Sequence, residues 1–252
     1  MYRFFVDPSD IDMQQGEVRI TGADVKHIRS VLRMKSGEQI LVCTGREDDP
    51  VEYLCEIDEI RSDDITARVV DLQKNARELG TDLYLFQALP KGDRFETVIQ
   101  KSVELGVHEV LPVMTARTIV KLDEKRAARK AERWNAISLS AAKQSKRSFI
   151  PPIREPMNWQ QALEAASKLD RILVPYEHAE GIRQTFRVLN EAKSAKSVGI
   201  FIGPEGGFEE REIEQLLELG AESITLGHRI LRTDTAAIAV LSMLMLYLEK
   251  EE

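Results

Sequence analysis

The feature that most constrains the fold is a change in the hydrophobic pattern near residue 80. Beyond it, short continuous apolar runs such as L-Y-L-F-Q-A-L (83–89) alternate with longer segments whose apolar residues recur at helical spacing. Strands that are apolar on both faces and separated by helices indicate a mostly parallel sheet covered on both sides. We therefore expect one α/β domain over residues 81–252. The pattern predicts strands at 83–89, 107–114, 171–176, 197–202 and 223–226, and helices at 95–106, 123–146, 159–167, 180–192, 208–219 and 234–248.

The first 72 residues follow a different pattern, with short alternating or β-branched runs between Gly, Asp and Pro. One amphipathic helix is predicted over 23–34, with Thr21 or Asp24 as its N-terminal cap. Strands with a single helix are typical of a small barrel-like domain, which we place at 1–72. The polar stretch 73–80 is the predicted linker. The strands are expected at 2–6, 17–21, 39–44, 51–57 and 65–70.

Composition limits the cellular setting. The two cysteines, Cys43 and Cys55, lack metal-ligand spacing, which favours reduced thiols in a cytoplasmic protein over a disulfide framework. The N-terminus lacks the apolar core of a signal peptide. The longest apolar run, 236–248, is shorter than the roughly 20 residues of a membrane span, so it is interpreted as a buried helix with no membrane partner. The four histidines are scattered, and no metal site is expected.

Charge is unevenly distributed along the chain. The net charge is −7, which by itself argues against a nucleic-acid partner. The segment 117–154, however, contains eleven basic and only three acidic residues. Local charge governs attraction to phosphate more than total charge does. Two interpretations stay open: a solvated helix face or an RNA-binding surface.

The stretch F-I-G-P-E-G-G (201–207) is a glycine-rich loop that follows a buried strand. It matches neither dinucleotide nor P-loop fingerprints, and a tight turn alone would explain its glycines. An acid, Glu205, lies inside it, and the next helix opens with F-E-E-R-E. These carboxylates disfavour a pyrophosphate and favour a phosphate-free, positively charged ligand. S-adenosylmethionine, a sulfonium, satisfies both conditions.

A second loop, L-G-H-R-I-L-R-T-D-T-A (226–236), follows the next strand. Ile230 and the leucine after it could sandwich an adenine, and Arg232 lies beside the start of the last helix. Thr233 or Asp234 is expected to cap that helix. Loops at the carboxyl ends of parallel strands meet at one edge of the sheet, where ligands bind. An ordinary strand–loop–helix with one surface arginine is the alternative.

Four ordered motifs together resemble the RsmE family of bacterial 16S rRNA uridine-N3 methyltransferases, which belong to the SPOUT superfamily. They are the stretches at 89–107, 144–153, 202–208 and 226–236. Their order and spacing match over essentially the whole chain. The resemblance implies a PUA-like β-barrel, a SPOUT α/β domain with a deep trefoil knot, S-adenosylmethionine as cofactor, a homodimer, and 16S rRNA or the small ribosomal subunit as partner.

The resemblance also assigns site residues. The cofactor site would be lined by Ile202, Gly203, Pro204, Glu205, Gly206, Leu226, Gly227, Ile230, Leu231 and Arg232. Lys91, Arg94, Gln144, Ser145 and Arg147 would lie towards RNA, and the basic segment adds Arg117, Lys143 and Lys146. The chain departs from the family pattern at Lys143 and Asp234, where glutamate is expected.

Three functions are weighed. The leading hypothesis is methylation of N3 of one uridine in 16S rRNA. The others are the same chemistry on tRNA or 23S rRNA, and a non-catalytic RNA-binding assembly factor. Uridine N3 carries a proton and is a poor nucleophile, so the reaction needs a base or a cation beside the uracil oxygens. Arg232 is the predicted catalytic cation, with Glu205 or Asp234 as the next candidates, each as a base.

Overall fold

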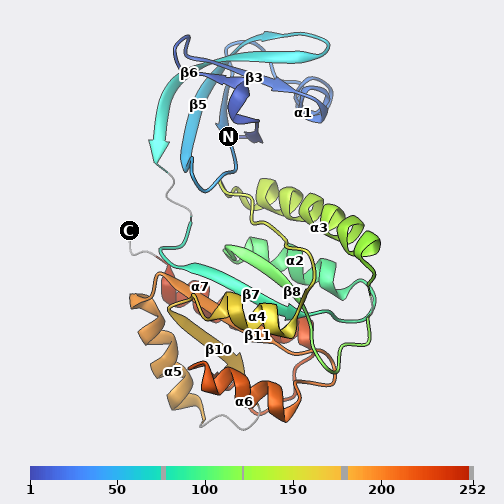
Figure 1. The fold of residues 1–252 in the computed structure, drawn as a ribbon. Helices are drawn as coiled ribbons and strands as arrows, with labels where there is room; N and C mark the ends of the chain where they lie inside the picture. Colours follow the sequence, from blue (N-terminus) through green and yellow to red (C-terminus); the bar gives the residue numbers. More distant parts are fainter. Residues whose placement is uncertain (75–77, 121, 177–180, 250–252) are drawn as a thin grey trace. The chain divides into compact units, whose positions relative to one another are not determined.

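The computed structural model describes residues 1–74, 78–120, 122–176 and 181–249 (Figure 1). Its contacts divide the chain into two compact units. Unit 1 comprises Met1–Glu78 and Ala142–Ile150, and unit 2 comprises Leu79–Ala141 and Pro151–Glu252. Residues 142–150, which the sequence ranges place in the second domain, thus pack with unit 1. Part of the predicted linker, 75–77, lies outside the described residues.

Unit 1 is built on a six-stranded sheet in the order β1-β4-β5-β6-β3-β2. β1 and β4 are parallel, and the other pairs are antiparallel. The five predicted strands and the predicted helix are all present, and the helix continues from an α-helical into a π-helical stretch. The elements are β1 (Arg3–Phe5), η1 (Pro8–Asp10), β2 (Ile11–Asp12), β3 (Glu17–Thr21), α1 (Ala23–Lys26), η2 (His27–Leu32), β4 (Gln39–Cys43), β5 (Val51–Ile60) and β6 (Asp64–Lys74).

The core of unit 1 follows from strand alternation. In β3, Val18 and Ile20 are buried while their neighbours are exposed, as a period of two requires. They pack with Ile40, Ile65 and the fully buried Ile28 of the π-helical stretch. A slip of one residue would turn these side chains to solvent, so burial fixes the register.

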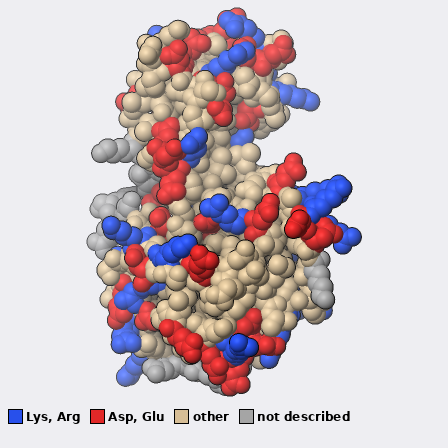
Figure 2. Space-filling view, viewed as in Figure 1, with Lys and Arg blue, Asp and Glu red and all other residues tan. Residues whose placement is uncertain are grey.

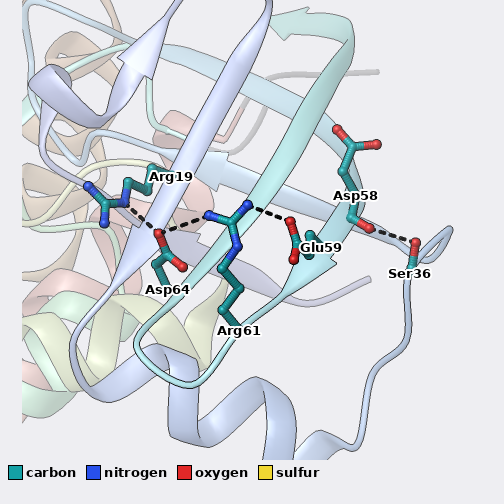
Figure 3. Close-up of polar contacts among 6 residues, drawn as sticks. All are labelled: Arg19, Ser36, Asp58, Glu59, Arg61 and Asp64. Atoms are coloured by element: carbon teal, nitrogen blue, oxygen red, sulfur yellow. Dashed lines mark hydrogen bonds and ion pairs between the residues drawn. The ribbon is translucent and has the colours of Figure 1, made fainter.

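Polar contacts at the β5–β6 hairpin support the same register (Figure 3). Arg19 of β3 donates to Asp64 at 2.9 Å, and Arg61 of the turn pairs with both Asp64 and Glu59. The Arg61–Glu59 pair is exposed on both sides and contributes little, roughly 0–1 kcal/mol, whereas Asp64 is buried and is bonded by an exposed arginine. The effect of these pairs is to align three neighbouring chain segments.

The predicted N-terminal cap of the helix that begins with α1 is wrong. Neither Thr21 nor Asp24 caps it: the N-cap residue is Gly22, which makes no side-chain hydrogen bond.

Unit 2 is built on a second six-stranded sheet, in the order β12-β10-β11-β7-β8-β9. All its strand pairs are parallel, which confirms the predicted α/β architecture. The elements are β7 (Asp82–Ala88), α2 (Arg94–Glu104), β8 (Glu109–Met114), α3 (Glu124–Ser145, whose last residues belong to unit 1), β9 (Met157–Asn158), α4 (Trp159–Ala166), β10 (Arg171–Pro175), α5 (Ile182–Glu191), η3 (Ala192–Ser194), β11 (Ser197–Ile202), α6 (Glu210–Glu218), β12 (Glu222–Ile224) and α7 (Thr233–Leu248).

Helices cover the sheet of unit 2 (Figure 1). α4 and α6 pack on one face over a core centred on Phe86 and Phe201, whose rings stack with centroids 4.3 Å apart. α7 packs against α2, α5 and β11. Because the strands are parallel, β7, β8, β11 and β12 all end at one edge of the sheet. The two predicted loops therefore leave the same edge.

The apolar C-terminal helix is a buried helix, as predicted. Val240, Leu241 and Leu244 of α7 are fully buried, whereas Leu246 is 75% exposed. Among the described residues, no helix combines the length and apolar character needed to cross a membrane. The trefoil knot implied by the resemblance stays a prediction.

Candidate cofactor and RNA site

The glycine-rich loop begins directly after Ile202, the last residue of β11. Its chain reverses in a turn in which the Gly207 N–H donates to the Pro204 carbonyl at 2.9 Å. A Cβ added to Gly203 would lie 3.2 Å from the Gly207 carbonyl carbon and the Phe208 nitrogen. A Cβ there would require the neighbouring backbone to move by a few tenths of an ångström, so the close approach of the chain to itself favours glycine at this position.

The second loop is tied to the first by Thr233. Its hydroxyl donates to the Gly203 carbonyl at 2.6 Å. The N-cap of α7 is Arg232, with no side-chain capping bond. The expectation that Thr233 or Asp234 caps α7 is therefore wrong, because the tertiary contact takes the threonine hydroxyl. The contact fixes the two predicted cofactor loops against each other.

The outer side of the glycine-rich loop contacts three residues that were expected to face RNA. The Glu205 carboxylate accepts from the Lys91 backbone N–H and from Arg94 Nη1, each at 3.1 Å. Arg117 Nη1 donates to the Gly206 carbonyl at 2.8 Å. Arg94 thus compensates the charge of Glu205, and the loop repels anions less than its sequence suggests.

A further carboxylate, Glu212, fixes a neighbouring segment and was missed as such. It is 5% exposed, and its two oxygens accept from the backbone N–H groups of Ala116 and Glu209 at 2.9 and 2.8 Å. The loop after β8 is thereby fastened to the start of α6. Its position three residues after the helix cap was the available sequence signal.

The ligand-facing candidates of the second loop differ in exposure. Ile230 is 95% exposed, and Arg232 and Gly227 are also exposed. Leu226 and Leu231 are half-buried. Gly227 has φ +100°, a conformation that favours glycine. The loop therefore presents apolar surface next to a cation.

The basic segment is less positive in the fold than in the sequence. In unit 1, Lys143 Nζ lies 2.8 Å from the Asp24 carboxylate, and Arg147, only 6% exposed, binds Glu78 with its Nε at 3.0 Å. Figure 2 shows acidic and basic side chains mixed on the face in view. Ion pairs with acids also involve Arg126, Arg133 and Arg154.

The remaining unit 1 candidates lie at the end of α3. Gln144 and Lys146 are exposed, and Ser145 is half-buried. Lys146 has φ +61°, the left-handed conformation that commonly ends a helix. Gln144 and Lys146 are thus the accessible members of this group.

The two thiols belong to unit 1, and His108 belongs to unit 2. Cys43 and Cys55 are buried in unit 1, and burial raises the pKa of each to about 12. They are therefore protonated and inert at neutral pH. His108 Nδ1 lies 3.4 Å from Asp82 at the start of β7, the end opposite the loops.

The fold and the loops agree with the class of RNA methyltransferases. Residues 77–245 match the family model for an RNA methyltransferase domain, and residues 20–70 match that for an RNA methyltransferase PUA domain. The N-terminal unit is thus PUA-like, as the resemblance implied.

Individual relatives narrow the class. Ribosomal RNA small subunit methyltransferase E of Bacillus subtilis is 37% identical over 246 residues, covering 96% of this chain and 95% of the relative. The protein of the same name from Mesomycoplasma hyopneumoniae is 35% identical, with 96% and 98% covered. The Neisseria gonorrhoeae enzyme of this name, solved with S-adenosyl methionine, gives a TM-score of 0.80 at 29% identity, with 96% and 95% covered. The chain belongs to the ribosomal RNA small subunit methyltransferase E family.

Proposed function

We propose that this protein transfers a methyl group from S-adenosylmethionine to N3 of a uridine in 16S rRNA. The family names support methyl transfer to small-subunit rRNA, and the Neisseria structure supports the methyl donor. The observation that carries the proposal is the meeting of two glycine-containing loops at one sheet edge, fastened through Thr233 and Gly203.

The residues of these loops fit the cofactor. The donor supplies an electrophilic methyl group on a sulfonium and contains no phosphate. Arg94 pairs with the Glu205 carboxylate, and Arg117 donates to the Gly206 carbonyl, so both guanidinium groups are engaged by the loop itself. Ile230 offers apolar surface for a purine, and a Cβ at Gly206 would meet only the Arg117 side chain, at 3.5 Å, an ordinary contact. The proposed cofactor site is Ile202–Gly206 with Leu226, Gly227, Ile230 and Leu231.

Arg232 is the proposed catalytic residue. Arg232 is exposed and directly follows Ile230 and Leu231 in the chain. It is the N-cap residue of α7, but its side chain makes no capping hydrogen bond. It would donate to a uracil carbonyl oxygen and stabilise the negative charge that develops when N3 loses its proton. Asp234 is the leading candidate base, because its Oδ1 is buried without a hydrogen-bond partner among the described residues.

RNA would be bound by exposed groups in both units. In unit 1 these are Gln144, Lys146 and the half-buried Ser145, and Lys143 and Arg147 would act from within their ion pairs. In unit 2 they are Lys91, Arg94 and Arg117. We also propose a homodimer, because the exposed Leu246 on α7 offers apolar surface to a second copy. A cytoplasmic location follows from the proposed substrate, ribosomal RNA.

The test is single-turnover methylation of small subunits from a strain lacking the enzyme, with modified nucleosides identified by mass spectrometry. Arg232→Ala should lower the rate by about 10²–10³, the effect of removing one oxyanion donor, with nearly unchanged cofactor affinity. Arg229→Ala, an exposed arginine in the same loop, is the matched control and should retain the rate.

Each alternative has its own outcome. Methyl transfer to tRNA or 23S rRNA but not to the small subunit would favour another substrate. Absence of cofactor binding by the unaltered protein would favour an assembly factor. A normal rate for Arg232→Ala would exclude Arg232 and direct attention to Asp234 or Glu205 as the base.

A further inference from the structure

Gln87 is a fully buried polar side chain in the sheet of unit 2. It lies near the end of β7, is 0% exposed, and has Ile202 of β11 and Pro112 of β8 as its register partners. A buried amide is costly unless it is hydrogen-bonded, and a methionine or leucine would fill the same space. Packing therefore does not explain a glutamine here.

The orientation of this amide is determined by its partners. Gln87 Nε2 donates to the Ala88 carbonyl and to Thr233 Oγ1, each at 2.9 Å. A carbonyl only accepts, so the NH2 group and not the oxygen must face Ala88. The amide oxygen is left without a partner among the described residues. An amide in this orientation is a donor to Thr233.

The direction of the threonine hydroxyl follows. Thr233 Oγ1 accepts from Gln87, so its own proton is available for the Gly203 carbonyl, which lies 2.6 Å away. The three groups form a hydrogen-bond relay, in which Gln87 donates to Thr233 and Thr233 donates to Gly203. Its end point is the residue at which the glycine-rich loop turns back on itself and where a Cβ would press on backbone atoms 3.2 Å away.

We propose that Gln87 is a positioning residue for the cofactor: it orients the Thr233 hydroxyl, which holds the Gly203 carbonyl and so fixes the shape of the glycine-rich loop before the cofactor arrives. The inference rests on the proposed cofactor site. A preorganised loop lowers the ordering cost of binding, so the relay acts on cofactor affinity rather than on RNA affinity.

The experiment measures binding of S-adenosylmethionine by calorimetry in full-length variants. Gln87→Met and Thr233→Val conserve volume while removing the donors. Each should weaken cofactor binding about tenfold, the effect of one buried hydrogen bond, and leave RNA affinity within about twofold. The double variant should be no weaker than the weaker single variant, because both break the same relay. Thr233→Ser keeps the hydroxyl and should bind nearly normally.

Ser102→Ala is the matched control for altering a buried polar group, since Ser102 is 0% exposed and lies outside the relay. It should not change cofactor affinity. Normal cofactor binding by folded Gln87→Met, additive losses in the double variant, or equal weakening of RNA and cofactor would each overturn the relay. Failure of the unaltered protein to bind cofactor would instead overturn the proposed function.

Discussion

The three glycines of the G-P-E-G-G-F turn should respond differently to alanine, because the structure gives each a different constraint. At Gly203 a Cβ meets backbone atoms at 3.2 Å, so the chain must shift, at about 1–3 kcal/mol. At Gly207 there is open space, but φ is +68°, which costs an L-residue roughly 1–2 kcal/mol. At Gly206 a Cβ would only touch the Arg117 side chain at 3.5 Å, an ordinary contact.

Thermal unfolding and cofactor calorimetry separate these effects. Each kcal/mol corresponds to about 2–4 °C in Tm for a chain of this size. Gly203→Ala and Gly207→Ala should lower Tm accordingly, whereas Gly206→Ala should leave it within about 2 °C. Gly206→Val should stay folded yet bind S-adenosylmethionine at least about 100-fold more weakly, because its side chain would occupy the space beside the ligand.

Two results would refute this reasoning. Normal cofactor binding by Gly206→Val would show that the loop does not cradle the cofactor. An unchanged Tm for Gly203→Ala, together with a lowered Tm for Gly206→Ala, would show that the close approach of the chain has been assigned to the wrong glycine.

Three further predictions concern the rest of the chain. Lys146→Gly should raise the free energy of unfolding by roughly 1 kcal/mol by relieving the left-handed conformation, and should reduce the log–log salt slope of RNA binding by about 0.7–0.9. Arg147→Met should instead destabilise unit 1 by about 3 kcal/mol in urea titrations, because it removes the buried guanidinium that pairs with the half-buried Glu78. Cys43 and Cys55 should resist a thiol reagent at pH 8 in the folded protein and react in urea. Because burial raises the pKa of each thiol from its ordinary value of 9.0 to about 12, the free energy of unfolding should fall as pH rises from 9 towards 12. Light scattering should give the mass of a dimer, and Leu246→Asp that of a monomer; a monomeric unaltered protein would refute the dimer.

Periodicity was sufficient to predict the order and type of most elements. The helix and strand periods are local, and the apolar runs of unit 2 match its longer strands closely. The two-residue strand β9 (Met157–Asn158) is too short to produce a period, and it was missed. The spatial order of the strands depends on contacts between distant segments, which no local pattern encodes.

Polar contacts between residues far apart in the chain could not be predicted from the sequence either. Lys143 and its partner Asp24 are 119 positions apart, so the sequence could not show that an acid neutralises this cation. Capping rules selected Thr233 for a local bond, and a bond to Gly203, 30 positions away, prevailed. The loop positions of the candidate site could be predicted from motifs, but the hydrogen bonds that shape it could not.

The buried Glu212 has a consequence for how mutational scans of this protein would be interpreted. Its carboxylate accepts hydrogen bonds from two backbone segments at once, so replacing Glu212 with alanine would release both the loop after β8 and the start of α6. Activity would fall although the side chain is turned away from solvent and bonded to the protein's own backbone. A scan scored by activity alone would rank this residue among the catalytic ones. Measuring both the methylation rate and the free energy of unfolding for each variant would show that the role of Glu212 is structural.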